Sequence, residues 1–167
     1  MINNTPNLRR RVSRLAACQC LYSYDLTKNS ATNIFTQFLE FHAAEQATFI
    51  FDEDYFRHLF FGTVQQINYL DEIIAQQSSR NIKLIDPIVR AILRYSIFEL
   101  LDKTTPAPVV IDEALEVTKA MVGKGIHTFV HSILDSTNKK YNSNENNSLA
   151  TNNKNVDEDN QVNDISF

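Results

Sequence analysis

Four arginines lie close together near the start of the chain, at Arg9, Arg10, Arg11 and Arg14, and residues 1–24 contain no acidic residue. On a helix, Arg10 and Arg11 both lie about one turn from Arg14, so the side chains gather on one side. A guanidinium group can donate two parallel hydrogen bonds to a phosphate. Because no acid lies nearby in the sequence, we expect these arginines to be solvated and to contact nucleic-acid phosphates.

The alternative interpretation of this cluster is a solvated helix start whose charges have no partner. Cations in the first turn of a helix oppose its dipole, which costs some tenths of a kcal/mol for each charge. A fold tolerates that cost, but four such residues together indicate a functional role. The sequence therefore favours nucleic-acid binding over a solvated surface without a binding function.

A pair of histidines and a pair of cysteines are residues of the kinds that bind metals, but neither pair has the spacing and further ligands of a metal site. His127 and His131 are four residues apart on an expected helix, but no acid follows the first histidine and no further ligand lies in the same turn. Cys18 and Cys20 are two residues apart and would face nearly opposite sides of a helix. We expect a histidine pair at the surface, two small buried thiols and no metal.

Asp112, Glu113 and Glu116 form the remaining cluster that could carry chemistry. They follow Pro108 in the first turns of an expected helix, where negative charge is stabilising. The sequence contains no glycine-rich phosphate loop, nucleophile elbow or cysteine–histidine arrangement. We therefore interpret the carboxylates as structural, and expect neither an enzyme nor a cofactor.

Composition indicates a chain that can bury a core. Of its 167 residues 43% are hydrophobic, only three are glycine, and the net charge is −4. No run of about 18 apolar residues is present, and the start lacks the apolar centre of a secretory signal. We expect a soluble cytoplasmic protein with no membrane partner.

Apolar residues recur at helical spacing through most of the chain, which predicts an all-α fold. Residues 1–140 are expected to form one domain. It consists of two packed three-helix bundles, about 1–78 and 79–140, and the polar segment 78–81 marks the boundary between them. Residues 141–167 are rich in asparagine and acidic, and we expect a disordered tail there. The predicted helices are 9–26, 32–45, one long helix at 51–77, 84–101 with Pro87 in its first turn, 108–122, and 126–137 after a glycine turn.

Several segments, each weak alone, together resemble the NusB family of bacterial transcription antitermination factors. Residues 9–26 resemble the first helix of that family, an arginine-rich turn followed by a pattern close to A-x-Q-x-L-Y. Residues 55–74 resemble its long helix, with Leu-x-x-Gly near the middle and Leu-Asp towards the end.

Three later segments continue the resemblance in the same order. Residues 92–101, "ILRYSIFELL", are similar to the family pattern I-L-R-x-A-x-Y-E-L. Residues 106–122 resemble P-x-x-V-x-I-N-E-A-x-E-L-A-K, and residues 127–135, "HTFVHSILD", resemble H-K-F-V-N-G-V-L-D. The resemblance extends over about residues 8–137.

This resemblance implies a fold of two helical bundles and a function in ribosomal RNA transcription. It implies binding of boxA-like single-stranded RNA jointly with the ribosomal protein NusE, and loading of a processive complex on RNA polymerase with other Nus factors. It also places the start of the last helix near RNA. Phe129 there is either a core residue or a partly exposed ring that stacks on a base, beside Lys124 and His127, and we favour the second.

The sequence departs from the family pattern at several positions. Asp112 stands where the family usually has Asn, and His131 and Ser132 replace its Asn-Gly. We expect Ser132 to crowd a close helix contact. Two other interpretations stay open. The first is a helical interaction scaffold without an antitermination role. The second is a module like the one at the front of some ribosomal RNA methyltransferases, here without the cofactor-binding domain of those enzymes.

Overall fold

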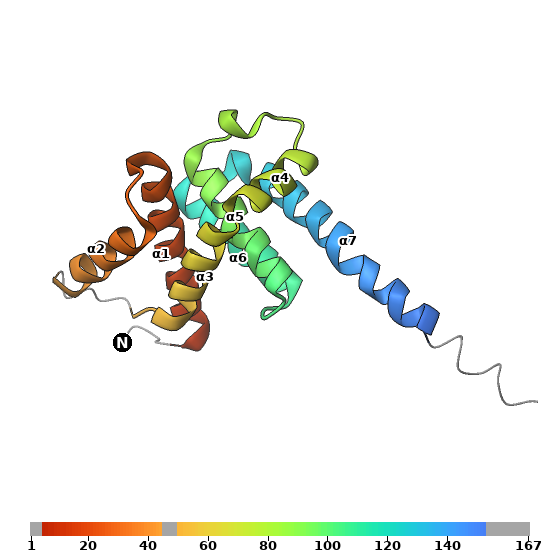
Figure 1. Ribbon diagram of the computed structural model, residues 1–167, viewed down its shortest axis with the longest axis horizontal. Coiled ribbons are helices and arrows are strands. Elements are labelled where there is room, and N and C mark those ends of the chain that lie inside the picture. The colour runs from red at the N-terminus through yellow and green to blue at the C-terminus, as the bar shows by residue number, and fades with distance from the viewer. Residues whose placement is uncertain (1–4, 45–49, 153–167) are drawn as a thin grey trace, which may run out of the picture.

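The computed structural model describes residues 5–44 and 50–152, without the side chains of Lys124 and of residues 143–152. The described residues contain seven α-helices, two short 3-10 helices and no strand, so the expected all-α fold is confirmed. In chain order the elements are α1 Pro6–Thr27, α2 Ala31–Ala44, α3 Glu53–Gln65, α4 Ile67–Gln77, η1 Ile82–Leu84, α5 Pro87–Asp102, α6 Ala107–Met121, η2 Lys124–Ile126 and α7 His127–Asn152 (Figure 1).

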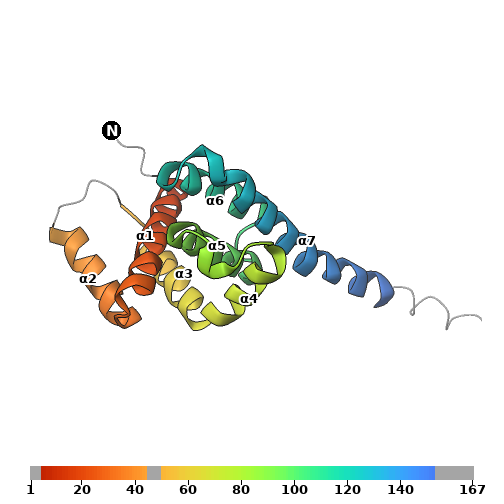
Figure 2. The ribbon, with the colours of Figure 1, turned by 90° about the horizontal axis from the view of Figure 1, so that it is seen from above.

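Helix α5 is the centre of the molecule. Every residue from Ala91 to Leu100 is buried, because α5 packs against α1, α3, α4, α6 and α7. Helices α1 and α3 lie on one side of it and α6 and α7 on the other, while α2 lies at the outer edge beside α1 (Figure 2). None of the described helices combines the length and the apolar character that a membrane-spanning helix requires.

Short polar side chains and prolines set where the helices begin. The Asp52 carboxylate accepts the backbone N–H of Tyr55 at 3.0 Å, and Asp86 accepts that of Ile88 at 2.8 Å. Each satisfies a donor that the first turn of a helix leaves without a partner. Pro87 occupies the first turn of α5, as the sequence predicts.

The single long helix predicted at 51–77 is wrong, because α3 and α4 are separate helices that meet at Gln66. This residue has φ −109° and ψ 13°, and its N–H donates to the carbonyl of Thr63 at 3.2 Å. The break redirects the chain so that Leu70 and Ile74 are buried where α4 packs on α5 and α7. Neither glycine nor proline stands at the break, so the local sequence does not reveal it. Helix α4 therefore packs with the C-terminal helices, although it precedes the polar segment 78–81.

Gly62 allows α3 to approach α5 closely. A Cβ atom added to Gly62 would overlap the ring of Phe98. The Leu-x-x-Gly pattern of the resemblance thus has a packing reason, because a larger residue would push the two helices apart.

Ion pairs with little solvent exposure join α1, α4 and α5. The Arg94 guanidinium donates to Asp71 at 2.6 and 2.7 Å and to Asp25 at 2.8 Å, and Arg90 donates to the same Asp25 oxygen at 2.8 and 3.0 Å. Burial raises the pKa of Asp25, but the hydrogen bonds and charges of Arg94 and Arg90 outweigh it, so the pKa lies below its usual value. These contacts fix the end of α1 to the central helix.

Helix α7 continues beyond the predicted end at Thr137 and leaves the body of the molecule (Figure 1). Its outward course begins after Thr137, which is fully buried, and Tyr141 is still half-buried against the core. Tyr141 therefore packs with the helical domain. Residues 153–167 of the expected tail lie outside the described residues.

Candidate nucleic-acid interface

Arg9 and Arg10 lie exposed at the start of α1. They border an open hollow of about 300 Å³, together with Pro6, Asn7 and Asp52. The guanidinium of Arg10 lies 5.0 Å from the centroid of the Tyr55 ring, a cation–π contact that holds the side chain over α3. The structure thus presents two arginines beside a concave surface, an arrangement suited to phosphate groups.

Arg14 is not solvated, and the expectation that its charge faces water is wrong. Its side chain is 3% exposed, and its Nε and Nη2 donate to the Glu99 carboxylate at 3.0 and 2.6 Å. The Tyr55 hydroxyl donates to the same carboxylate. Burial lowers the pKa of Arg14, but the hydrogen bond and charge of Glu99 outweigh it, and the pKa lies above its usual value. The Arg14 guanidinium therefore neutralises a buried carboxylate, which would be costly to leave without a partner in the core.

Arg11 is exposed but also has an acidic partner. Its Nε and Nη2 donate to the two Glu113 oxygens at 2.9 and 2.7 Å, and Arg14 Nη1 lies 3.7 Å from the same carboxylate. The hydrogen bond from Arg11 is the main reason why the pKa of Glu113 lies below its usual value. Glu113 therefore pairs with an arginine 102 positions away, in addition to lying in the first turns of its own helix.

The sequence contained one signal for these pairs. Glu99 falls on the apolar stripe of α5, between positions that face the core. A carboxylate at such a position needs a cation or several hydrogen bonds, because burial of an unpaired charge is prohibitive. The sequence alone does not show which arginine reaches this carboxylate.

The second set of predicted site residues lies at the start of α7. Phe129 is half-buried against the core, which agrees with the expected partial exposure. His127 is half-buried at the first position of α7, and Lys124 opens η2. The guanidinium of the exposed Arg80, in the segment between α4 and η1, lies 5.0 Å from the centroid of the Phe129 ring. Sequence reasoning missed Arg80 because only the tertiary structure brings it to this ring.

The two sets of residues are far apart in the fold. Helix α1 begins at the bottom of Figure 1 and α7 begins near the top. One ligand that contacts both sets would have to be extended, which suits a single strand of nucleic acid better than a small molecule.

Cys18 and Cys20 are buried free thiols, as expected. Burial raises the pKa of each to about 12, so both are protonated and unreactive at neutral pH. Among residues 5–44 and 50–152, no three or more histidine, cysteine, aspartate or glutamate side chains gather as a metal would require.

The positions where the sequence departs from the family pattern lie at the surface. Asp112, His131 and Ser132 are all exposed. The expectation that Ser132 crowds a helix contact is therefore wrong, because its side chain points to solvent rather than to a neighbouring helix. These three residues therefore lie outside the described core.

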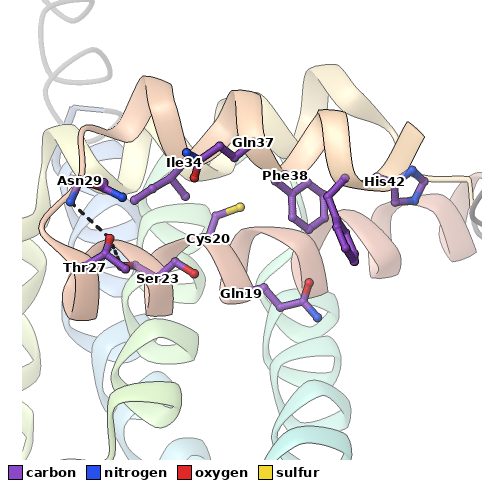
Figure 3. A pocket seen from close by; sticks show the side chains of 10 residues that line it. Gln19, Cys20, Ser23, Thr27, Asn29, Ile34, Gln37, Phe38 and His42 are labelled. Atoms are coloured by element: carbon purple, nitrogen blue, oxygen red, sulfur yellow. Dashed lines mark hydrogen bonds between the residues drawn. The ribbon is translucent and has the colours of Figure 1, made fainter. Parts of the chain in front are cut away.

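A separate hollow of about 450 Å³ lies between α1 and α2 (Figure 3). Cys20, Ser23 and Gln19 of α1 face Ile34 and Phe38 of α2 across it. Its lining contains no arginine or lysine. It therefore offers a phosphate no guanidinium or ammonium group.

Comparison with known proteins gives one consistent result. The NusB family profile matches residues 11–139. The chain is 35% identical over 136 residues to the transcription antitermination protein NusB of Coxiella burnetii, covering 81% of this chain and 93% of that protein. It is 37% identical over 131 residues to the protein of the same name from Colwellia psychrerythraea, covering 78% and 92%.

Solved structures show the same fold. T. maritima NusB superposes with a TM-score of 0.68 at 25% identity, covering 79% of this chain and 92% of that chain. A structure of the antitermination factors NusB and NusE in complex with double-stranded RNA superposes with a TM-score of 0.68 at 24% identity, covering 80% and 98%. The second similarity establishes the shared arrangement of helices.

Proposed function

The chain belongs to the NusB family, and from this we propose that it is a transcription antitermination factor that binds RNA. The observation that carries the proposal is the pair of exposed arginines, Arg9 and Arg10, beside the hollow at the start of α1. Relatives that match most of this chain are transcription antitermination proteins. An exposed arginine cluster gives such a protein a means of holding the phosphate backbone.

The proposed RNA site has two parts. Arg9, Arg10 and Arg11 contact phosphates, and Arg14 supports them from the core by fixing α1 to α5. At the start of α7, Phe129 stacks on an unpaired base, beside the guanidinium of Arg80. As the family resemblance implies, Lys124 and His127 contact the same part of the RNA. Stacking on an aromatic ring is tolerant of base identity, so sequence preference has to come from other contacts.

We further propose that boxA-like single-stranded RNA is the ligand and that a NusE-type ribosomal protein binds jointly with it. The support for the single-stranded ligand is the family resemblance. The support for joint binding is a similar solved structure in which NusB and NusE occur together with double-stranded RNA. In this proposal the protein acts in the bacterial cytoplasm, with other Nus factors on RNA polymerase. It acts by binding, without catalysis.

The test is fluorescence anisotropy of labelled boxA-like RNA with the full-length protein, with and without the partner, over a series of salt concentrations. A scrambled strand and a duplex of the same length are the controls. We expect binding that weakens with salt and tightens when the partner is added. The absence of binding at low salt, even with the partner present, would refute the proposal.

A further inference from the structure

Glu113 holds Arg11 in the geometry that a phosphate would use. The two Arg11 donors reach the two carboxylate oxygens at 2.9 and 2.7 Å, a two-pronged contact. Carboxylates and phosphates both accept this paired arrangement from a guanidinium. In the protein without RNA, the two Arg11 donors are therefore already bound to the Glu113 carboxylate.

Arg11 can leave this contact readily. Its side chain is 46% exposed, whereas Glu113 is 17% exposed and lies closer to the core. Water can solvate the guanidinium on its way to another partner, and exposed ion pairs contribute little to stability. Of the two partners, Arg11 is thus the one that moves.

Glu113 would not be left without a cation if Arg11 moved. Arg14 Nη1 lies 3.7 Å from Glu113, and Glu99 fixes the other edge of the same guanidinium. Arg14 cannot follow Arg11 to the surface, because its side chain is 3% exposed. The carboxylate therefore keeps a positive neighbour, which lowers the free-energy cost of releasing Arg11.

We propose that Glu113 is an internal competitor for RNA phosphate that sets the affinity of the RNA site by occupying Arg11. This inference rests on the proposed RNA-binding function. Binding exchanges the carboxylate for a phosphate at Arg11, with no covalent change. Arg11 differs in this respect from Arg10, whose guanidinium contacts a neutral ring.

The test is the RNA affinity of Glu113→Gln, which keeps the shape of the side chain and removes its charge. Because exposed ion pairs are weak, we expect RNA to bind about two- to five-fold more tightly. The matched control is Asp112→Asn, which removes the same charge from an exposed neighbouring position. An equal gain in the control would mean a general charge effect and would overturn the inference, as would a loss of affinity in Glu113→Gln.

A double-mutant cycle with Arg11→Gln shows whether the effect passes through Arg11. We expect Glu113→Gln to tighten binding less in the Arg11→Gln background than in the wild type. Equal gains in both backgrounds would contradict the proposal. Circular dichroism of each variant checks that the helices remain folded.

NMR of the wild-type protein gives a second test that needs no variant. The Arg11 Nε–Hε resonance, assigned by its loss in Arg11→Gln, should shift as RNA is added. If RNA binds and this resonance stays unchanged, Arg11 has not exchanged partners and the inference fails. If RNA does not bind at all, the proposed function fails instead, so the two failures are distinguishable.

Discussion

Arg14 and Glu99 form a buried, two-pronged ion pair that joins the first helix to the central helix. They are 85 positions apart in the sequence. Arg14 belongs by sequence to an exposed basic cluster, yet its guanidinium is enclosed by α1, α3 and α5. The cluster therefore divides into a buried anchor and a surface part, and mutations should separate the two.

We predict that Arg14→Met lowers the free energy of unfolding by about 3–5 kcal/mol, because it leaves the Glu99 carboxylate buried without its cation. Urea denaturation measures the loss. Arg10→Met, at an exposed position of the same helix, should change stability by less than about 0.5 kcal/mol. The double variant Arg14→Met with Glu99→Leu should recover part of the loss. Equal, small effects of the two single variants would contradict the anchoring role.

Arg10→Ala should weaken RNA binding and reduce its salt dependence. Loss of one phosphate contact to a single strand should lower the slope of log affinity against log salt by about 0.7. Because Arg10 is exposed, this substitution tests the surface without the loss of stability expected from Arg14. Lys139→Ala, on the outward part of α7, removes one charge elsewhere and should leave the slope unchanged. A normal slope in Arg10→Ala would place the RNA on another surface.

Phe129→Leu should reduce RNA affinity more than stability. Leucine keeps most of the apolar contact with the core but cannot stack on a base, and stacking contributes roughly 1–3 kcal/mol. Anisotropy and thermal melting measure the two effects on the same samples. Arg80→Ala should also weaken binding, because its guanidinium lies over the Phe129 ring. A large drop in melting temperature with normal RNA affinity would assign Phe129 to the core.

The Asp25 ion pairs should make stability depend on acid pH. The pKa of Asp25 is lower in the folded protein than in the unfolded chain. The ionised Asp25 therefore contributes fully to the free energy of unfolding above the usual aspartate pKa near 4, and this contribution is lost as the pH falls towards the lower pKa of the folded protein. We expect Asp25→Asn to be less stable at pH 7 and to lose less stability than the wild type between pH about 5 and 2. Asp112→Asn, at an exposed position, should follow the wild-type curve. Parallel curves for Asp25→Asn and wild type would refute this role.

Deletion of residues 142–167 should change the free energy of unfolding by less than about 1 kcal/mol, because this asparagine-rich segment has few apolar residues to bury. Removal of Tyr141 as well should cost more, since Tyr141 packs against the core. Thermal melting of the two truncated proteins distinguishes them. The deleted segment is acidic, and its loss should tighten RNA binding at low salt if it competes for the arginines. A large destabilisation by the shorter deletion would show that the tail packs.

Local features of the fold could be predicted from the sequence because they depend on near neighbours. The helical periods, the proline at the start of α5 and the glycine turn before α7 each involve residues within a few positions of one another. The break at Gln66 could not be predicted, because it depends on the course that α4 must take to reach α5 and α7. No glycine or proline marks it.

The all-helical fold, the resemblance to the NusB family and the arginine cluster near the start can all be recognised in the sequence alone. The role of each arginine follows from the folded structure. Arg14 meets Glu99 and Arg11 meets Glu113, across 85 and 102 positions of sequence, whereas Arg10 faces a ring and the solvent. Charge pairing depends on distance in space and on burial, so an arginine cluster with no acid nearby in the sequence can still be partly neutralised in the folded protein.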